Sequence, residues 1–201
     1  MSKLSKKKVI GITGSMGSGK SEISRYLRKK YPVLDCDQVN ADLLKKGNLG
    51  YQKLNDLHIV ELDSNGEIIK ESLASYMFSN EEHRKQVEAI LHPLIFDEMH
   101  KWIYEQESLI VFVEMPILFE ISAQEHFDSI WCVVADLDVA LSRLQTYRNF
   151  TREQALARLV SQMNPEEKMA KSDIVLRNNS TVEQLHMQIE DALKEEKLNG
   201  D

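Results

Sequence analysis

A glycine-rich segment near the start of the chain has the residue types and spacing needed to bind phosphate. It reads Gly14-Ser15-Met16-Gly17-Ser18-Gly19-Lys20-Ser21 and fits GxxxxGK[ST] at every fixed position. Glycines let successive backbone N–H groups converge on phosphate oxygens, and the N-terminal end of the helix expected next favours the same anion. In this pattern the lysine contacts the β and γ phosphates, and the serine hydroxyl binds Mg²⁺.

The pattern therefore predicts a nucleoside triphosphate site in which Lys20 is catalytic and Ser21 is a ligand of Mg²⁺. The alternative, a glycine-rich turn that only caps a helix, leaves the lysine and serine unexplained. The predicted nucleotide-binding residues are Ser15, Met16, Gly17, Ser18, Gly19, Lys20, Ser21 and Glu22.

Two acids, Asp35 and Asp37, follow a second short apolar segment. In a parallel sheet the carboxyl ends of the strands face the ligand crevice. If the extended conformation continues through Asp37, both carboxylates point to one side, where one can hold an acceptor hydroxyl and the other can support Mg²⁺ through water. The alternative is that Asp37 is the N-cap of the helix expected next. A cap alone does not explain two acids.

Other charged residues lie near the ends of later predicted elements. Glu114 closes an apolar strand and is a candidate second carboxylate for Mg²⁺, although acids are common at strand ends. Arginines on two predicted helices after the fourth strand can neutralise charge on a transferred phosphoryl group, or be solvated and paired with acids. These arginines are Arg143, Arg148, Arg152 and Arg158. No HxxxH or HExxH spacing predicts a histidine metal site.

The elements that position these residues alternate between strands and helices. The strand candidates are short and mostly apolar on both faces, which is typical of strands buried in a parallel sheet. They lie at residues 9–13, 33–35, 109–114, 130–135 and 174–176. Helical periodicity occupies the intervals between them. The alternation predicts an α/β fold with a doubly wound parallel sheet.

Local signals predict where several elements begin and end. Ser79–Glu82 and Thr151–Gln154 have the form of capping boxes, and Asn164-Pro165 that of a cap followed by proline at the first helical position. Asp63–Gly66 reads as a turn, and His92-Pro93 is expected to interrupt a helix.

Length and composition bound the class of protein. A chain of 201 residues predicts one domain with a smaller appended piece, and 42% hydrophobic residues suffice for a core. The formal charge, 25 − 32 = −7, disfavours a partner that is nucleic acid. No apolar run of membrane-spanning length occurs, so no membrane association is expected. Cys36 and Cys132 lie in apolar runs and are expected to be reduced core thiols.

The two ends of the chain carry little signal. The basic segment Ser2–Lys8 fits a solvated terminus better than a nucleic-acid arm, and the following residues do not form a secretory leader. Residues 195–201 are expected to fray. We therefore expect a cytoplasmic protein.

The chemistry of the nucleotide depends on the remaining motifs. The guanine-reading NKxD of GTPases is missing, and the DxxG match at Asp63–Gly66 is better interpreted as a turn. A mechanochemical ATPase normally needs a larger chain. The sequence thus favours a small-molecule kinase that uses ATP and Mg²⁺.

The chain resembles the bacterial dephospho-coenzyme A kinases. The matching segments are residues 11–21, Val33–Asp37, Glu88–Ile95, Pro116–Glu120, Thr151–Arg158 with Gln162, and Lys171–Asn178. The resemblance implies transfer of the γ-phosphate of ATP to the ribose 3′-hydroxyl of dephospho-coenzyme A, the last step of coenzyme A synthesis, with Asp37 as the catalytic base. Of the arginines named above, Arg143 and Arg148 are predicted to be catalytic.

The resemblance further implies a division of labour along the chain. A five-stranded nucleotide-binding core of the phosphate-loop kinase type would comprise residues 1–64, 108–140 and 163–201, with a helical substrate domain at residues 65–107 and a helical lid at 141–162. The implied substrate-binding residues are Asp35, Asp37, His92, Pro116, Leu118, Phe119 and Glu120.

The chain departs from the family pattern at several positions. Glu22 replaces a threonine, Lys70 replaces an arginine, and the second lid arginine aligns with Tyr147 while Arg148 lies one position later. On a helix that offset rotates a side chain by about 100°. At Glu114 the family itself varies.

Three rival functions stay open on the sequence. A nucleoside monophosphate kinase has little use for an acceptor base at Asp37. A shikimate kinase would share the two acids but carry a glycine triplet that is missing here, and would lack His92-Pro93. A nucleotide-sensing module without turnover would not need the two acids Asp35 and Asp37. We expect the functional protein to be a monomer.

Overall fold

The computed structural model describes residues 7–198 and divides the chain into two compact units. The first, the core unit, contains the described residues up to Leu34 and those from Gln106 onward, and the second, the helical unit, is Asp35–Glu105. The basic segment predicted to be a solvated terminus lies largely outside the described residues, as do residues 199–201.

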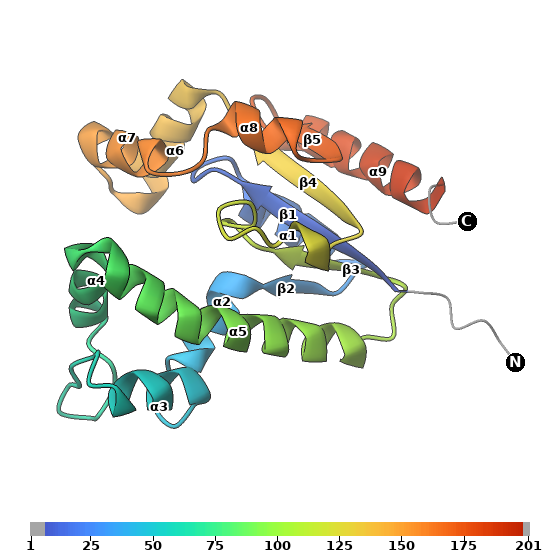
Figure 1. The fold of residues 1–201 in the computed structure, drawn as a ribbon. Helices are drawn as coiled ribbons and strands as arrows, with labels where there is room; N and C mark the ends of the chain where they lie inside the picture. Colours follow the sequence, from blue (N-terminus) through green and yellow to red (C-terminus); the bar gives the residue numbers. More distant parts are fainter. Residues whose placement is uncertain (1–6, 199–201) are drawn as a thin grey trace, which may run out of the picture. The chain divides into compact units, whose positions relative to one another are not determined.

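Five strands form one sheet, in the order β2-β3-β1-β4-β5 (Figure 1). Their bounds are β1 Lys8–Gly14, β2 Val33–Asp35, β3 Ile110–Glu114, β4 Ser129–Val134 and β5 Ile174–Arg177. The central strand β1 pairs in parallel with both β3 and β4, so that Ile12 lies opposite Glu114 and Trp131. The predicted α/β class with a parallel five-stranded sheet is confirmed.

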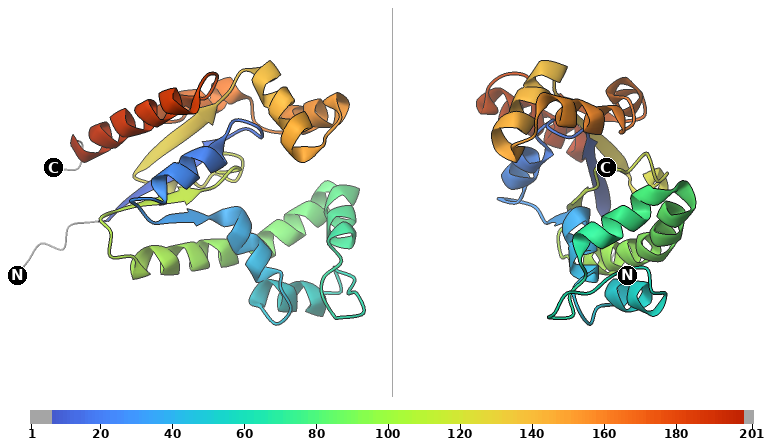
Figure 2. Two further views of the ribbon diagram at one scale, coloured as in Figure 1. Left: turned by 180° about the vertical axis from the view of Figure 1, so that it is seen from behind. Right: turned by 90° about the vertical axis from the view of Figure 1, so that its left-hand side faces the viewer.

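The two faces of β1 are covered by different segments of the core unit. Ile10 and Ile12 are fully buried against α1 (Lys20–Leu27) and α9 (Val182–Leu198), which Figure 2 shows from behind. Gly11 points to the opposite face, where an added Cβ would lie 2.9 Å from Leu118. Side chains alternate along a strand, so Thr13 also lies on this second face.

Three further helices of the core unit gather around the segment that follows β1. They are α6 (Leu137–Arg148), α7 (Arg152–Val160) and α8 (Pro165–Ala170), and a short 3₁₀ helix, η1 (Gln124–His126), precedes β4. Met16 packs against an apolar cluster formed by α6 and α7. The predicted capping box of Thr151 with Gln154 and the Asn164 cap of α8 are both confirmed. The residues predicted as a lid thus fold within the same compact unit as the sheet.

The helical unit is built around one long helix, α5 (Glu81–Glu105) (Figure 1). Helices α2 (Cys36–Leu43), α3 (Leu49–Asp56) and α4 (Lys70–Ser79) pack against α5. Its core contains Leu54, Val87 and Leu91. The compact helical unit begins at Asp35, because α2 and α3 also pack against α5. The substrate domain expected at residues 65–107 stays a prediction.

Two local predictions in the helical unit are wrong. Pro93 does not interrupt α5, because buried Leu91 and Leu94 anchor the helix on both sides of it. The cap of α5 is not Ser79 but Asn80, whose side-chain oxygen accepts from the His83 N–H at 2.8 Å. The predicted turn at Asp63–Gly66 is confirmed by a 2.9 Å bond from the Gly66 N–H to the Asp63 carbonyl.

Residues 195–198 do not fray as predicted, because α9 continues to Leu198; the rest of the predicted frayed segment lies outside the described residues. Glu196 is only 3% exposed and forms an ion pair of 2.7 Å with Lys8 on β1. It also accepts hydrogen bonds from Ser129 and from the Trp131 indole of β4. These bonds fasten the last helix to the sheet. Across residues 7–198, the helices are all too short or too polar to cross a membrane.

Candidate phosphoryl-transfer site

The predicted phosphate loop, residues 14–21, connects β1 to α1 and has the backbone shape its glycines allow. Gly17 and Gly19 adopt φ values of +77° and +100°, a region that favours glycine. Within residues 7–198 no hydrogen bond uses the N–H of either glycine. The Ser18 hydroxyl is buried without a hydrogen-bond partner in the same part of the structure. The loop therefore offers donors beside the N-terminus of α1, where an anion is favoured.

Lys20 and Ser21 open helix α1 at the end of this loop. The Lys20 ammonium donates to the carbonyls of Gly14 and Ser15 at 2.7 and 3.0 Å, so its side chain folds back over the loop. Ser21 is exposed in the first turn of the helix. Both predicted residues therefore lie where the phosphate-loop pattern requires them.

Arg143 and Asn178 hold the loop from the side of α6 and β5. The Asn178 amide donates to the Ser18 carbonyl at 2.9 Å, and its oxygen accepts from Arg143 at 3.1 Å. Arg143 also reaches the carbonyls of Gly17 and Ser18, at 3.4 Å each. Of the predicted arginines, Arg143 is thus the one that the structure brings to the loop.

The other predicted arginines are exposed on α6 and α7. Arg148 ends α6, and Arg152 begins α7. The Arg158 guanidinium lies over the Phe150 ring at 4.7 Å from its centroid, which is a cation–π contact. The structure does not bring these three to the loop, and the catalytic role of Arg148 stays a prediction.

Glu22 follows the loop serine on α1 and is held by neighbouring side chains. It pairs with His186 of α9 at 3.1 Å and with Arg25. Burial raises the pKa of the Glu22 carboxyl, but the hydrogen bonds from Arg25 and His186 outweigh it and lower the pKa. The side chain that departs from the family pattern is therefore engaged away from the loop.

Glu114 at the end of β3 is buried and bonded to the helix that carries the loop. Its carboxylate accepts from the Ser24 hydroxyl at 2.6 Å, and Ser24 is itself fully buried. This bond fixes α1 against the sheet. The idea of a second carboxylate for Mg²⁺ at Glu114 stays a prediction.

The two predicted acids do not both end a strand. Strand β2 ends at Asp35, whose carboxylate accepts from the N–H groups of Asp37 and Gln38 at 2.9 and 3.3 Å. Asp35 is therefore the N-cap of α2, and Asp37 lies exposed in the first turn of that helix. The expected strand alternation is wrong here, because the cap turns the chain into a helix at Cys36.

His92 lies half-buried on α5 in the helical unit. Burial lowers the pKa of its imidazole, although the Glu88 carboxylate raises it. The lowered pKa favours the neutral imidazole, which can donate from one nitrogen and accept at the other.

The predicted substrate segment Pro116–Glu120 forms a turn between β3 and β4 in the core unit. The Pro116 carbonyl accepts from the Thr13 hydroxyl at 3.0 Å. Leu118 and Phe119 are buried, and Leu118 packs beside Gly11. Polar contacts between this segment and other described elements are made by the Pro116 carbonyl and the Glu120 carboxylate.

Three residues of the core unit hold the site and were given no role from the sequence. Asn178 follows β5, and its place at the carboxyl end of a parallel strand was a usable signal. The Gln162 oxygen accepts from the Met16 N–H at 2.9 Å, and Lys168 is completely buried. Nothing in the local sequence indicates the Gln162 contact or the burial of Lys168, because lysine and glutamine are usually exposed at the protein surface.

A cavity of about 360 Å³ adjoins the loop, between the end of β4 and helices α6 and α7. Its walls are mainly apolar and include Met16, Leu137, Leu156 and Leu159. Such walls suit an uncharged part of a ligand, whereas the loop donors suit its anionic part.

The loop at the end of the central parallel strand, with helices beside it, places the chain in the class of phosphate-loop kinases. A family model described as dephospho-CoA kinase matches residues 8–184. The chain belongs to the dephospho-CoA kinase family.

The chain is similar to other proteins over most of its length. A dephospho-CoA kinase of Bacillus cereus is 36% identical over 92% of this chain and 96% of its own length. The solved protein TT1252 from Thermus thermophilus has a TM-score of 0.83 and 32% identity, covering 94% of this chain and 98% of that one. A dephospho-CoA kinase from Campylobacter jejuni, 24% identical, shares the fold with a TM-score of 0.70 over 97% of this chain and 100% of that one.

Proposed function

We propose that the protein transfers the γ-phosphate of ATP to the ribose 3′-hydroxyl of dephospho-coenzyme A, giving coenzyme A and ADP. The observation that carries this proposal is the phosphate loop of this chain, a member of the family. Arg143 and Asn178 bind the loop carbonyls, and the N–H groups of Gly17 and Gly19 can donate to a ligand. In a loose phosphoryl-transfer transition state, positioning and charge neutralisation supply most of the catalysis. Lys20 and Arg143 are the cations that would neutralise this charge.

The donor set of the loop fits Mg²⁺. Mg²⁺ is usually held by one or two protein oxygens together with phosphate oxygens and water, and the Ser21 hydroxyl is such an oxygen at the start of α1. When bound, Mg²⁺ would neutralise charge on the phosphates. Lys20 would contact the β and γ phosphates, for which its side chain must leave the carbonyls of Gly14 and Ser15.

Asp37 is the proposed catalytic base. It lies in the first turn of α2, at the helix end that carries partial positive charge. An ionised carboxylate can orient the acceptor hydroxyl and accept its proton late in the transfer. Asp35 supports this role by capping the same helix. His92, Pro116 and Glu120 are proposed to contact the acceptor.

The first test measures Mg²⁺-dependent ADP production with dephospho-coenzyme A, shikimate or AMP as acceptor. Turnover with dephospho-coenzyme A alone is the expected result. Turnover with shikimate or AMP alone would refute the acceptor, and ATP binding without any turnover would favour the sensing module.

The second test replaces the proposed base. Asp37→Asn is expected to lower kcat about 100-fold, the scale of general base catalysis, while the protein stays folded by circular dichroism. Asp42→Asn is the matched control, because Asp42 lies on the same helix and is bonded to Lys45 and Gln38. The control should retain kcat within about twofold. Near-normal turnover of Asp37→Asn would refute the assignment.

We also propose that the protein is monomeric and cytoplasmic. Its two cysteines, Cys36 and Cys132, are buried and not joined in a disulfide, which suits a reducing compartment. Light scattering at the assay concentration should give a mass near 23.2 kDa. Twice that mass would contradict the monomer.

A further inference from the structure

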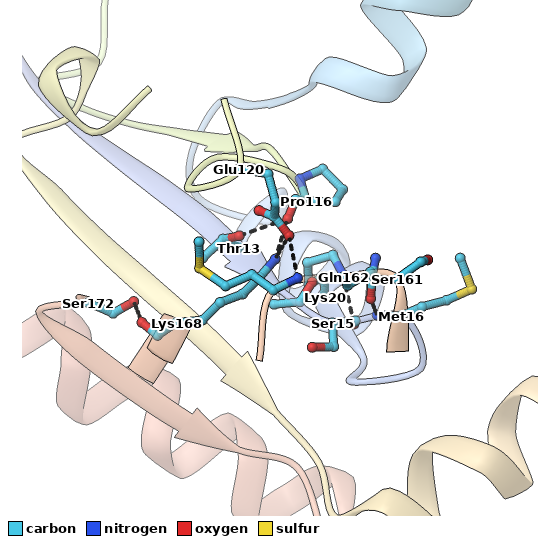
Figure 3. A network of polar contacts seen from close by, with 12 residues as sticks. Thr13, Ser15, Met16, Lys20, Pro116, Glu120, Ser161, Gln162, Lys168 and Ser172 are labelled. Atoms are coloured by element: carbon cyan, nitrogen blue, oxygen red, sulfur yellow. Dashed lines mark hydrogen bonds and ion pairs between the residues drawn. The ribbon is translucent and has the colours of Figure 1, made fainter. Parts of the chain in front are cut away.

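Lys168 of α8 is a completely buried lysine beside the phosphate loop. Its ammonium donates to the Pro116 carbonyl at 2.9 Å and pairs with the Glu120 carboxylate at 2.8 Å. The Pro116 carbonyl also accepts from Thr13, the residue directly before the loop. Figure 3 shows the side chains of Lys20, Lys168 and Glu120 lying together beside Pro116.

Glu120 extends this network to the junction between α7 and α8. The same Glu120 oxygen that pairs with Lys168 accepts from the Met163 N–H at 3.2 Å. The residue before Met163 is Gln162, whose side chain accepts from the Met16 N–H of the loop at 2.9 Å (Figure 3). Lys168 is therefore connected to the turn, to the junction and, through them, to the loop.

The charge environment places Lys168 and Lys20 in the same small region. The Cys132 thiol of β4 is buried, and burial raises its pKa against the influence of Ser172, Lys168 and Lys20. Burial of the Lys168 ammonium is costly, since desolvating an ammonium costs several kcal/mol. A well-packed apolar side chain often serves stability as well as or better than a buried ion pair. Stability alone therefore does not account for Lys168.

We infer that Lys168 is a positioning residue for phosphoryl transfer. It fixes the Pro116–Glu120 turn beside β1 and, through Glu120, holds the α7–α8 junction so that Gln162 stays on the phosphate loop. This inference rests on the proposed function for its kinetic consequences, but the contacts themselves do not depend on the identity of the acceptor.

The kinetic test compares Lys168→Met with Lys171→Met. Lys171 follows the same helix and is exposed, so its replacement removes the same charge without a buried partner. Lys168→Met is expected to lower kcat about 10- to 100-fold, the scale of a misplaced reacting group, with the KM for ATP changed less than about threefold. Rates are measured well below the melting temperature of each variant. A kcat of Lys168→Met within about threefold of Lys171→Met would overturn the inference.

A double-mutant cycle of Lys168→Met with Glu120→Gln tests whether Lys168 affects kcat through Glu120 or independently of it. If Lys168 acts through Glu120, Lys168→Met adds little to the loss of kcat that Glu120→Gln already causes. Independent, multiplying losses would contradict that route.

Hydrogen exchange gives a readout that needs no substrate. Peptides containing Met16 and Met163 are expected to exchange faster in Lys168→Met than in Lys171→Met, because both amides depend on the junction. Unchanged exchange would overturn the inference even in an active kinase. Faster exchange in a protein that does not phosphorylate dephospho-coenzyme A would instead refute the proposed function and leave the positioning role standing.

Discussion

The phosphate loop has no room for a side chain at Gly19. A Cβ added there would lie 2.0 Å from the Asn178 amide nitrogen, and the φ of +100° is already strained for other residues. The strain costs about 1–2 kcal/mol, and the clash displaces the side chain that holds the Ser18 carbonyl. We expect Gly19→Ala to weaken Mg·ATP binding at least about tenfold in calorimetry.

Gly47→Ala is the matched control for this prediction. Gly47 also has a positive φ, +89°, but an added Cβ meets nothing within 4 Å. Its replacement should cost about 1–2 kcal/mol of unfolding free energy and leave ATP affinity unchanged. ATP affinity of Gly19→Ala equal to that of the native chain would show that Asn178 can move without harm to the loop.

The residues of the site differ in how far the sequence could predict them. The loop and Lys20 were predictable because their pattern is contiguous and each position has its own physical requirement. The bond from Asn178 to Ser18 joins residues far apart in the chain, so only the fold reveals it. Lys168 is the extreme case, because nothing in a short polar helix predicts a completely buried charge.

At the scale of the element, prediction succeeded where hydrogen bonds close within a few residues. The capping box of Thr151 and Gln154 is such a case. Prediction failed at Asp37, where the strand was expected to continue. The Asp35 carboxylate accepts hydrogen bonds from the N–H groups of Asp37 and Gln38, so a helix begins there instead. The local pattern also does not show that α2 and α3 belong to the compact helical unit, because their packing on α5 depends on tertiary contacts.

Helix α5 contains a proline, Pro93, in its interior. Pro93 lacks the N–H of a normal helical residue, which costs about 3 kcal/mol in a helix interior. The side chain is exposed, so alanine leaves no cavity. We expect Pro93→Ala to raise the unfolding free energy by about 1–3 kcal/mol in urea titrations.

Pro165→Ala tests whether that gain is specific to a helix interior. Pro165 stands at the start of α8, where proline removes no helical hydrogen bond. Its replacement should leave stability unchanged or slightly lower it. An equal gain in both variants, or no gain at Pro93, would show that α5 has already adjusted to its proline.

At the scale of the whole molecule, the core unit is assembled from segments at opposite ends of the chain. Strand β1 and helix α9 meet through Lys8 and Glu196, and β4 contributes Ser129 and Trp131 to the same carboxylate. The sequence predicted a frayed end here because charged residues near a terminus usually are solvated. The contact joins residues far apart in the chain, so the pattern of α9 alone does not reveal it.

The Glu196 carboxylate makes the stability of the core unit depend on pH. Burial raises its pKa, but the hydrogen bonds from Lys8, Ser129 and Trp131 outweigh burial and lower the pKa below its usual 4.5. A lowered folded-state pKa stabilises the protein above pH 4.5, and this contribution is lost as the pH falls through the lowered value. Glu196→Gln is expected to cost about 1–3 kcal/mol at pH 7 in thermal or urea unfolding, and the difference from the native chain should shrink below pH 4.5. Exposed Glu195→Gln should show neither effect, and a loss for Glu196→Gln that is the same at every pH would mean that packing, and not charge, fastens α9 to the sheet.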